Sequence, residues 1–162
     1  MKERRGFTIV EVMIVIVIMA ILLVIGTVLF RGYQSSARDK EREADVAAIQ
    51  AYLESIYPME LRAGLKENGD VVKPAGAYPT TTDSGYQEVI FKDLDAASLT
   101  PPGADSRLKV PTLQPVVPSP SDVATIKDKY VYTPGAGGRS YTLSYVTEVG
   151  GETLKKVESK RR

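Results

Sequence analysis

The stretch Phe7–Phe30 reads FTIVEVMIVIVIMAILLVIGTVLF and decides the fold of this 162-residue chain. Its 24 residues include one charged side chain, Glu11, and one glycine, Gly26. As a helix, the stretch is about 36 Å long, which exceeds the roughly 30 Å hydrocarbon core of a membrane. A core helix buried inside a protein of this size is rarely apolar on every side. The stretch therefore predicts a helix that inserts into a membrane.

The residues on either side of the apolar stretch predict its orientation and its processing. The six residues before it, MKERRG, carry three basic side chains, which favours a cytoplasmic N-terminus with most of the chain outside the cytoplasm. The stretch is longer than the apolar region of an ordinary signal peptide, which spans about 7–15 residues. Conventional cleavage at Ser35-Ser36-Ala37 is disfavoured, because Arg31 and Tyr33 separate that site from the apolar stretch.

The composition of the chain argues against a conventional enzyme. It has no cysteine and no histidine, so it has no thiolate nucleophile, no Cys/His zinc site and no imidazole base. We therefore predict no catalytic, cofactor-binding or metal-binding residues. The 21 basic and 20 acidic side chains nearly balance, so the net charge gives no support for nucleic acid as a partner.

Glu11 is the most informative single residue. A carboxylate costs about 2.5–3.5 kcal/mol at the centre of a bilayer and less near its surface, and such groups are usually paired and functional. The sequence Gly6-Phe7-Thr8-Ile9-Val10-Glu11, placed between a short basic leader and an uninterrupted apolar helix, resembles the class III signal of type IV pilins and pseudopilins.

This resemblance implies processing and an assembly role. A prepilin peptidase would cleave after Gly6, and the new amino terminus at Phe7 would be N-methylated. Glu11 would compensate the amino terminus of a neighbouring subunit during filament assembly, and the pairing of two buried charges would fix the axial register. Removal of the leader would leave 156 residues with 18 basic and 19 acidic side chains.

The helix is expected to continue beyond the membrane, from Phe7 to Tyr57, with Pro58 as its stop. The stretch 31–57 lacks proline, and its apolar residues recur with the spacing of one helical stripe. These residues are Val46, Ile49, Leu53 and Ile56. The charged run 38–43 alternates in sign and is interpreted as a solvated helix face with pairs such as Arg38–Glu41 and Asp39–Arg42.

The remainder, residues 58–162, contains all ten prolines and is expected to form a small head. Alternation of Tyr141, Leu143 and Tyr145 with smaller residues predicts a strand in 140–147, flanked by strands at 129–133 and 153–157. We expect an α+β, pilin-like fold in which a long N-terminal helix packs its amphipathic half on a small C-terminal antiparallel sheet. The tyrosines are interpreted as packing residues.

The predicted organisation has four parts. Residues 1–6 form the leader, 7–30 the transmembrane and filament-core half of the helix, 31–57 its amphipathic half, and 58–162 the head, with a loop-rich region 58–126 and antiparallel strands in 127–158. The scattered aspartates of the head show no calcium-binding spacing, and the basic residues at 155–162 are interpreted as a solubilising tail.

The resemblance leaves two filament functions open. The chain is expected to be a structural subunit of a type IV pilus or pilus-like filament for adhesion, motility or surface attachment, or a type II secretion or competence pseudopilin that moves protein or DNA. A third hypothesis is a signal-anchored single-pass membrane protein with a binding head. The implied partners are identical or related pilin subunits, prepilin peptidase, the membrane, and an inner-membrane assembly platform with its ATPase. The precursor would lie in the cytoplasmic membrane and the mature subunit in a cell-surface filament.

Overall fold

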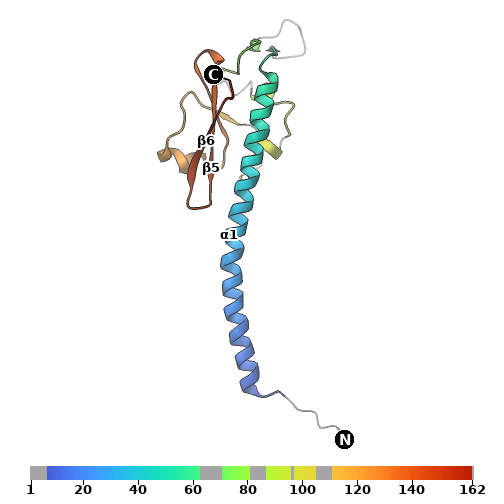
Figure 1. Cartoon of the computed structure of the whole chain (residues 1–162), viewed down its shortest axis with the longest axis vertical. Coiled ribbons are helices and arrows are strands. Elements are labelled where there is room, and N and C mark those ends of the chain that lie inside the picture. The colour runs from blue at the N-terminus through green and yellow to red at the C-terminus, as the bar shows by residue number, and fades with distance from the viewer. Residues whose placement is uncertain (1–6, 63–70, 81–86, 96, 105–110, 162) are drawn as a thin grey trace.

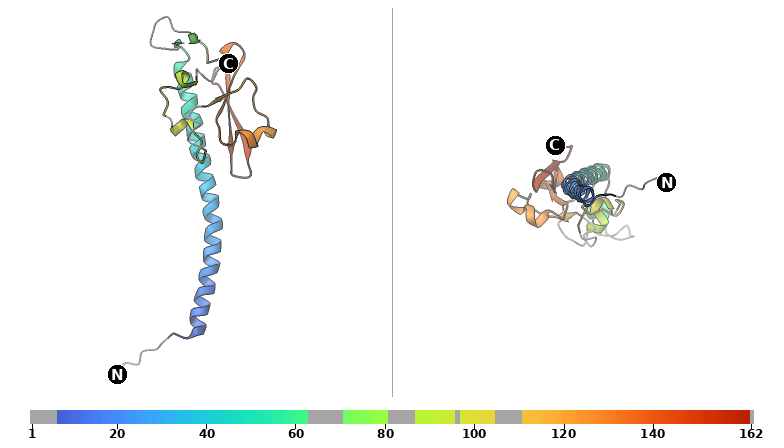
Figure 2. Two further views of the ribbon diagram at one scale, coloured as in Figure 1. Left: turned by 180° about the vertical axis from the view of Figure 1, so that it is seen from behind. Right: turned by 90° about the horizontal axis from the view of Figure 1, so that it is seen from below.

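The computed structural model describes residues 7–62, 71–80, 87–95, 97–104 and 111–161 of the chain (Figure 1). One long helix, α1 (Ile9–Ile56), runs the length of the molecule, and the head lies beside its C-terminal half. The two further views show that the N-terminal half of α1 extends away from the head without touching it (Figure 2). This arrangement confirms the predicted α+β, pilin-like fold.

The 48 residues of α1 form one uninterrupted helix of about 72 Å. The helix starts two residues later than predicted because Thr8 takes an extended conformation and serves as the N-cap. It ends at Ile56, with Tyr57 as the C-cap immediately before Pro58. Because the pyrrolidine ring of proline blocks a further helical turn, the predicted stop at Pro58 agrees with this boundary.

A four-stranded sheet forms the centre of the head, in the order β3 (Thr112–Leu113), β4 (Val131–Pro134), β5 (Tyr141–Thr147) and β6 (Thr153–Glu158). Strands β4, β5 and β6 pair as the predicted antiparallel meander. The short β3 adds a parallel pairing with β4 that the sequence did not predict. At the β5–β6 turn, Gly150 and Gly151 both have positive φ, which glycine adopts without steric cost.

The amphipathic half of α1 covers one face of the sheet. Its predicted stripe is buried, with Ile49 and Leu53 fully inaccessible to solvent, and packs into the same cluster as Tyr132, Tyr141 and Leu143. Burial of this kind stabilises the fold by about 25 cal/mol per Å² of apolar area removed from water. The interpretation of the tyrosines as packing residues is therefore confirmed.

Several buried tyrosines also bind the helix through their hydroxyl groups. The hydroxyl of Tyr130 donates to Oδ2 of Asp45 at 2.6 Å, and that of Tyr78 donates to Oε1 of Glu54 at 2.8 Å. Burial is the main cause that raises the pKa of both phenols, so they stay protonated donors at neutral pH. Each aromatic ring thus fills the core while its polar end fixes the helix.

Shorter elements cover the remaining sides of the core. The helix α3 (Val123–Ile126), which follows the 3₁₀ turn η3 (Pro120–Asp122), places Ile126 against the second face of the sheet. The helix α2 (Gln87–Ile90) and the 3₁₀ turn η2 (Ala97–Leu99) bring buried apolar side chains to α1 from another side. A third 3₁₀ turn, η4 (Ala136–Gly138), connects β4 to β5.

A two-stranded pair, β1 (Leu61–Arg62) and β2 (Val71–Lys73), follows the end of α1. The side chain of Lys73 is fully buried, and its ammonium group donates to the backbone carbonyls of Tyr57, Met59 and Pro74. Carbonyl groups at a helix C-terminus lack partners within the helix and favour a nearby positive charge. Lys73, on β2, therefore caps the C-terminal end of α1.

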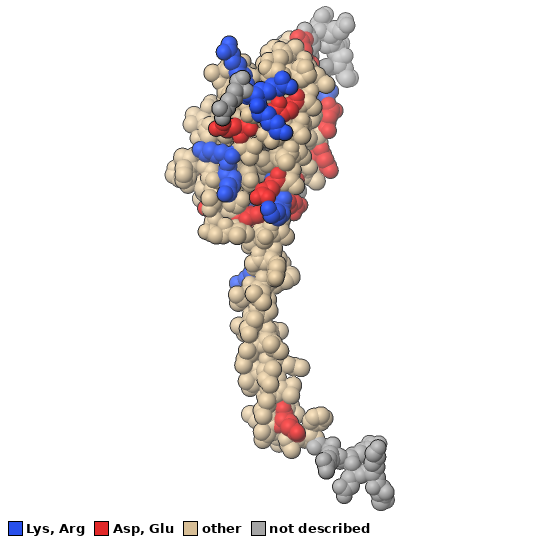
Figure 3. Space-filling model, viewed as in Figure 1, with Lys and Arg blue, Asp and Glu red and all other residues tan. Residues whose placement is uncertain are grey.

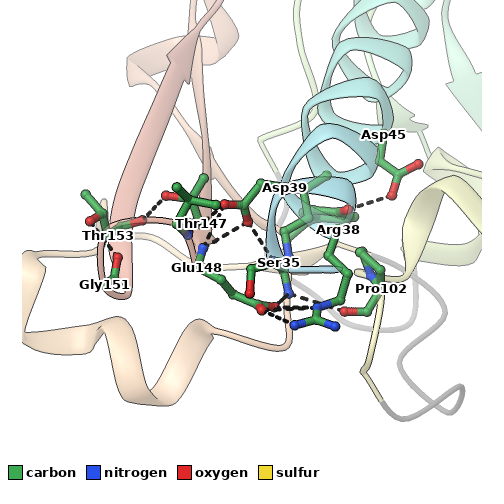
Figure 4. A network of polar contacts seen from close by, with 12 residues as sticks. Ser35, Arg38, Asp39, Asp45, Pro102, Thr147, Glu148, Gly151 and Thr153 are labelled. Atoms are coloured by element: carbon green, nitrogen blue, oxygen red, sulfur yellow. Dashed lines mark hydrogen bonds and ion pairs between the residues drawn. The ribbon is translucent and has the colours of Figure 1, made fainter. Parts of the chain in front are cut away.

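Reciprocal polar contacts join α1 to the β5–β6 turn at the lower edge of the head (Figure 4). The Asp39 carboxylate accepts from the backbone N–H groups of Glu148, at 2.9 and 3.0 Å, and Val149, at 2.9 Å. The Glu148 carboxylate accepts in return from Arg38 Nε at 3.1 Å and from Arg42 Nη2 at 2.6 Å. We call these residues, Arg38, Asp39, Arg42 and Glu148, the head clamp.

The head clamp corrects the interpretation of the charged run 38–43 as a solvated face. Asp39 and Arg42 are only 7% and 4% exposed. Their predicted pair forms, with 2.9 Å between Arg42 Nη1 and Asp39 Oδ1. Arg38, however, pairs with Glu148 on the sheet. The exposed Lys40–Glu43 pair is the part of the run that agrees with the prediction of a solvated face.

The C-terminal basic residues also differ from the predicted solubilising tail. Lys155 and Lys156 are part of β6. The backbone N–H of Lys160 and the Nε of Arg161 both donate to the carboxylate of Glu54, at 3.2 Å each. The guanidinium of Arg161 lies 4.6 Å from the ring centre of Tyr57. The end of the described chain is therefore bound to α1.

Replacing Glu148 by glutamine tests the head clamp. Hydrogen bonds from Arg38, with a smaller contribution from Arg42, lower the pKa of Glu148 to about 2. The group therefore stabilises the fold above its ordinary pKa of 4.5, and this contribution is lost as the pH falls from about 5 towards 2. Glu148→Gln should cost about 1–3 kcal/mol at pH 7 and flatten this acid dependence, measured by urea unfolding in detergent. Glu43→Gln, in the exposed pair, should change neither quantity; equal losses from both variants would contradict a special role for the clamp.

Replacing Lys73 by methionine tests the cap at the end of α1. Methionine keeps most of the apolar volume but donates no hydrogen bond, so the carbonyls of Met59 and Pro74 lose their buried donor. The variant should be destabilised by about 1–3 kcal/mol in the same assay. Lys92→Met, at an exposed position, is the control and should be neutral. A Lys73→Met variant as stable as the parent would show that the cap contributes nothing.

Candidate assembly site on the exposed half of the helix

The N-terminal half of α1 presents apolar side chains to its surroundings on every side. All of its large apolar residues from Ile9 to Phe30 are exposed. In the described part of the chain, α1 is the one helix long and apolar enough to cross a membrane. The space-filling view shows this bare shaft with almost no charge, below a head whose surface is rich in charge (Figure 3). An apolar surface of this extent is stable only in a membrane or against other apolar surfaces.

The polar groups within the shaft are satisfied locally. The hydroxyl of Thr27 donates to the backbone carbonyl of Val24 at 2.8 Å, which is the bond expected of a threonine inside a helix in an apolar medium. Next to it, a Cβ placed on Gly26 would have no described atom within 4 Å apart from its chain neighbours and the nearby helix backbone. This glycine therefore reflects no close packing within the single chain.

Glu11 and Thr8 form a capping box at the start of the shaft. Oε2 of Glu11 accepts from the backbone N–H of Thr8 at 2.8 Å and from its hydroxyl at 2.9 Å. The hydroxyl of Thr8 accepts in turn from the backbone N–H of Glu11 at 3.2 Å. The box satisfies two N–H groups at the helix start, and the negative charge lies where the helix dipole favours it.

This capping box leaves part of the carboxylate available. Within the described residues, Oε1 of Glu11 accepts no hydrogen bond. The side chain lies beside a shallow apolar hollow of about 340 Å³ that Phe7, Val12, Val15 and Ile16 also line. The lining of the hollow is apolar, the stem of Glu11 included, so it can hold an apolar side chain.

Of the predicted processing residues, Phe7 lines this hollow. Phe7 precedes the N-cap and is 88% exposed. Gly6 lies outside the described residues. The structure thus brings Phe7 and Glu11 together at one end of the shaft.

Sequence reasoning missed the head clamp and the contacts of Glu54. Asp39 and Glu148 are 109 residues apart, and no local pattern pairs them. The available signal was Glu148 just ahead of Gly150-Gly151. A tight turn at two glycines leaves backbone N–H groups that a carboxylate from another element can bind. In the described part of the chain, no cluster of three or more acidic residues is arranged to hold a metal ion.

Comparison with known proteins gives the N-terminal end a family context. The model of the prokaryotic N-terminal methylation motif matches residues 1–27. Two curated relatives, both named fimbrial protein and both from Pseudomonas aeruginosa, are 28% identical to this chain over 93 residues. The matched region is 57% of this chain and 55% of each relative, so the chain spans about half the length of the curated relatives it matches. No solved structure matches it significantly.

The motif covers the basic leader, the Gly-Phe pair and Glu11, which are the residues on which the predicted resemblance rested. The long helix and the small sheet agree with that resemblance independently of the sequence match. The chain therefore carries the prokaryotic N-terminal methylation motif on a pilin-like fold, and its resemblance to the type IV pilins and pseudopilins is confirmed.

Proposed function

We propose that this chain is a structural subunit of a type IV pilus or pilus-like filament, made as a membrane-inserted prepilin and polymerised through α1. The observation that carries the proposal is Glu11, a partly available carboxylate at the start of the exposed and otherwise uncharged shaft, which is the part of α1 from Ile9 to Phe30. A membrane anchor alone has no use for this charge, because a carboxylate in apolar surroundings raises the free energy of insertion.

Processing would create the partner of this carboxylate. Cleavage by prepilin peptidase between Gly6 and Phe7 leaves Phe7 as the new amino terminus, and the matched motif supports methylation at that residue. An N-methylated amino group keeps its positive charge. Because Phe7 and Thr8 precede the helix, the new terminus is next to the hollow beside Glu11.

Assembly would then pair charges between copies. The amino terminus of one subunit approaches Oε1 of Glu11 on a neighbour, while the apolar shafts pack against each other. Two charges buried in this environment are stable only when paired, and an unpaired charge costs about 3–5 kcal/mol. Displacing one shaft along another would break this pair, so the pair fixes the axial position of each subunit.

The driving force for assembly would be burial of the shafts. Each copy presents the same apolar surface in the same direction, so contacts repeat from copy to copy and generate an open helix rather than a closed ring. Extraction from the membrane requires energy, which an assembly platform and its ATPase would supply. The role of this chain is therefore structural and not catalytic.

Topology follows from the charges around the shaft. The basic leader favours a cytoplasmic N-terminus in the inner membrane, and the head would lie on the opposite side. The same signal and shaft would also serve a secretion or competence pseudopilin. Long surface filaments in electron micrographs favour the pilus; loss of secretion or DNA uptake without visible filaments favours the pseudopilin.

The N-terminus of the mature chain tests processing. The mature protein should begin at Phe7 and carry one additional methyl group on its amino terminus. Intact mass and N-terminal sequencing of protein purified from the native host measure both properties. A mature chain that begins at Met1 or Arg38 would contradict the proposed processing.

Glu11→Gln tests assembly, since glutamine keeps the size of the side chain and removes its charge. The variant should insert into the membrane normally and yield at least about tenfold fewer filaments, because a pair worth about 1.4 kcal/mol or more is lost. Sheared filaments and membrane-bound subunits are quantified separately.

Thr8→Val is the matched control, because it weakens the capping box but keeps the charge of Glu11. It should retain most of the filament yield. Equal losses in Thr8→Val and Glu11→Gln would show that Glu11 acts only as a helix cap, and a normal yield from Glu11→Gln would refute the assembly role.

A further inference from the structure

The head has two flanks of opposite charge on different sides of α1. The acidic flank consists of Glu41, Asp45, Asp93 and Asp95. The basic flank consists of Arg139, Lys155, Lys156, Lys160 and Arg161. Figure 1 shows β6 and the segment that contains residues 87–95 against different sides of α1, and the view along the helix in Figure 2 agrees.

The acidic flank is a connected surface. Glu41 and Asp45 are one helical turn apart on α1. The hydroxyl of Tyr52 on α1 donates to the carbonyl of Ile90 at 2.8 Å, which holds the segment with Asp93 and Asp95 against the helix. Burial is the main cause that raises the pKa of Asp45, and the negative charges of Glu41 and Asp95 raise it further. Asp93 adds its charge near the hydroxyl of Tyr52. Glu41, Asp93 and Asp95 are exposed.

The basic flank follows the edge of the sheet. Strand β6 is the last strand of the sheet, and its exposed Lys155 and Lys156 lie opposite Tyr145 and Ser144 of β5. Neither lysine forms an ion pair with a described residue. Lysines on an edge strand oppose pairing with a further strand, so the contact available to this edge is one between side chains.

A groove at the upper end of β6 extends the basic flank. Arg139 and Arg161 line this hollow of about 330 Å³ together with Glu158. Glu54 binds Nε of Arg161, and the ring of Tyr57 lies beneath its guanidinium. Both contacts orient Arg161, while its terminal NH groups donate no hydrogen bond to a described residue. An oriented guanidinium loses less entropy when it binds a carboxylate.

The two flanks are separated by the buried stripe of α1. Glu41 and Asp45 lie on one side of this stripe. Gln50 and Glu54 lie on the other side, where Gln50 Nε2 donates to the carbonyl of Glu158 at 2.9 Å and Glu54 binds Arg161. The flanks therefore cannot neutralise each other within one copy.

We propose that the acidic flank of one copy docks on the basic flank of the adjacent copy. The inference rests on the proposed filament only for the orientation of the copies. When shafts pack side by side and point in the same direction, the acidic flank of one head faces the basic flank of the next. Contact between equal flanks would place like charges together, so the complementary contact is heterologous and repeats without closing.

The contact orients heads more than it drives assembly. Exposed charges are screened over about 8 Å at physiological ionic strength, and each exposed pair contributes little. Several pairs acting together reject the wrong neighbour by repulsion between like charges. Burial of the shafts remains the main source of stability.

Charge reversal in the full chain tests the contact. Glu41→Lys with Asp93→Lys should reduce filament yield at least about fivefold, and so should Lys155→Glu with Lys156→Glu. Combining all four substitutions should restore at least half of the parental yield, because the complementarity returns with opposite signs. Lys127→Glu with Asp128→Lys, just after α3, is the control and should assemble normally.

Three results would overturn the proposed contact: normal yield from either reversed pair, failure of the combined variant to recover, or an equal loss in the control. Unfolding of each variant in detergent verifies that the heads are folded. If the Glu11-dependent filaments form while the reversals have no effect, the proposed function stands and the flank contact fails.

Cysteine cross-linking in membranes detects the same contact even where no filament forms. Because the chain has no cysteine of its own, only the introduced cysteines can react. Asp93→Cys combined with Lys156→Cys, treated in membranes with a short bis-maleimide, should give a ladder of dimers, trimers and larger species. Each single variant should stay monomeric. A ladder without filaments would support the contact and count against the filament function; monomers only, or dimers from a single-cysteine variant, would overturn the contact.

Discussion

The reciprocal bonds between Asp39 and the turn after β5 fix the position of the head along α1, and the rest of the molecule depends on that position. Asp39 holds the backbone of the turn, and the side chain of Glu148 in this turn returns to Arg38 and Arg42. Because α1 and the turn each bind the other, the turn cannot move along the helix without breaking several charged hydrogen bonds. Below this level no described residue of the head covers the helix, and above it the stripe of α1 becomes part of the core of the head.

One helix therefore occupies two different surroundings. Its first half needs apolar surroundings, whereas its second half needs the sheet on one side and water on the other. The absence of cysteine means that no disulfide holds the head together. In its place, charged and phenolic side chains bind groups on α1 or at its end: the head clamp, Tyr130 with Asp45, Tyr78 with Glu54, and Lys73 with the C-terminal carbonyls. The head is thus anchored to the helix at several levels along its length.

The sequence predicted those parts of the fold that depend on local patterns. The apolar run, the stripe from Val46 to Ile56 and the alternation around Leu143 each report a periodicity that survives in the structure. The solvated interpretation of Asp39 and Arg42 was wrong because helix spacing shows which charges are neighbours on the helix but not what packs against them. The parallel pairing of β3 was missed for a similar reason, since two residues carry no periodic signal. At the candidate site, the motif around Glu11 was readable, but the use of one carboxylate oxygen by Thr8 required coordinates.

The two carboxylates Asp39 and Glu11 show how one helix separates folding from assembly. Asp39 meets its backbone and guanidinium donors within the same chain, so it stabilises the fold and has little left to offer a neighbour. At Glu11, Thr8 occupies one oxygen, and no described residue of the chain reaches the other. In water this second oxygen would simply be hydrated. In the proposed filament the packed apolar shafts would exclude water, so its donor would come from another chain. A cationic amino terminus would match the charge of Glu11, and the aromatic side chain beside it would match the apolar hollow. The difference between the two residues lies in the donors within reach of each carboxylate, because both belong to the same continuous helix.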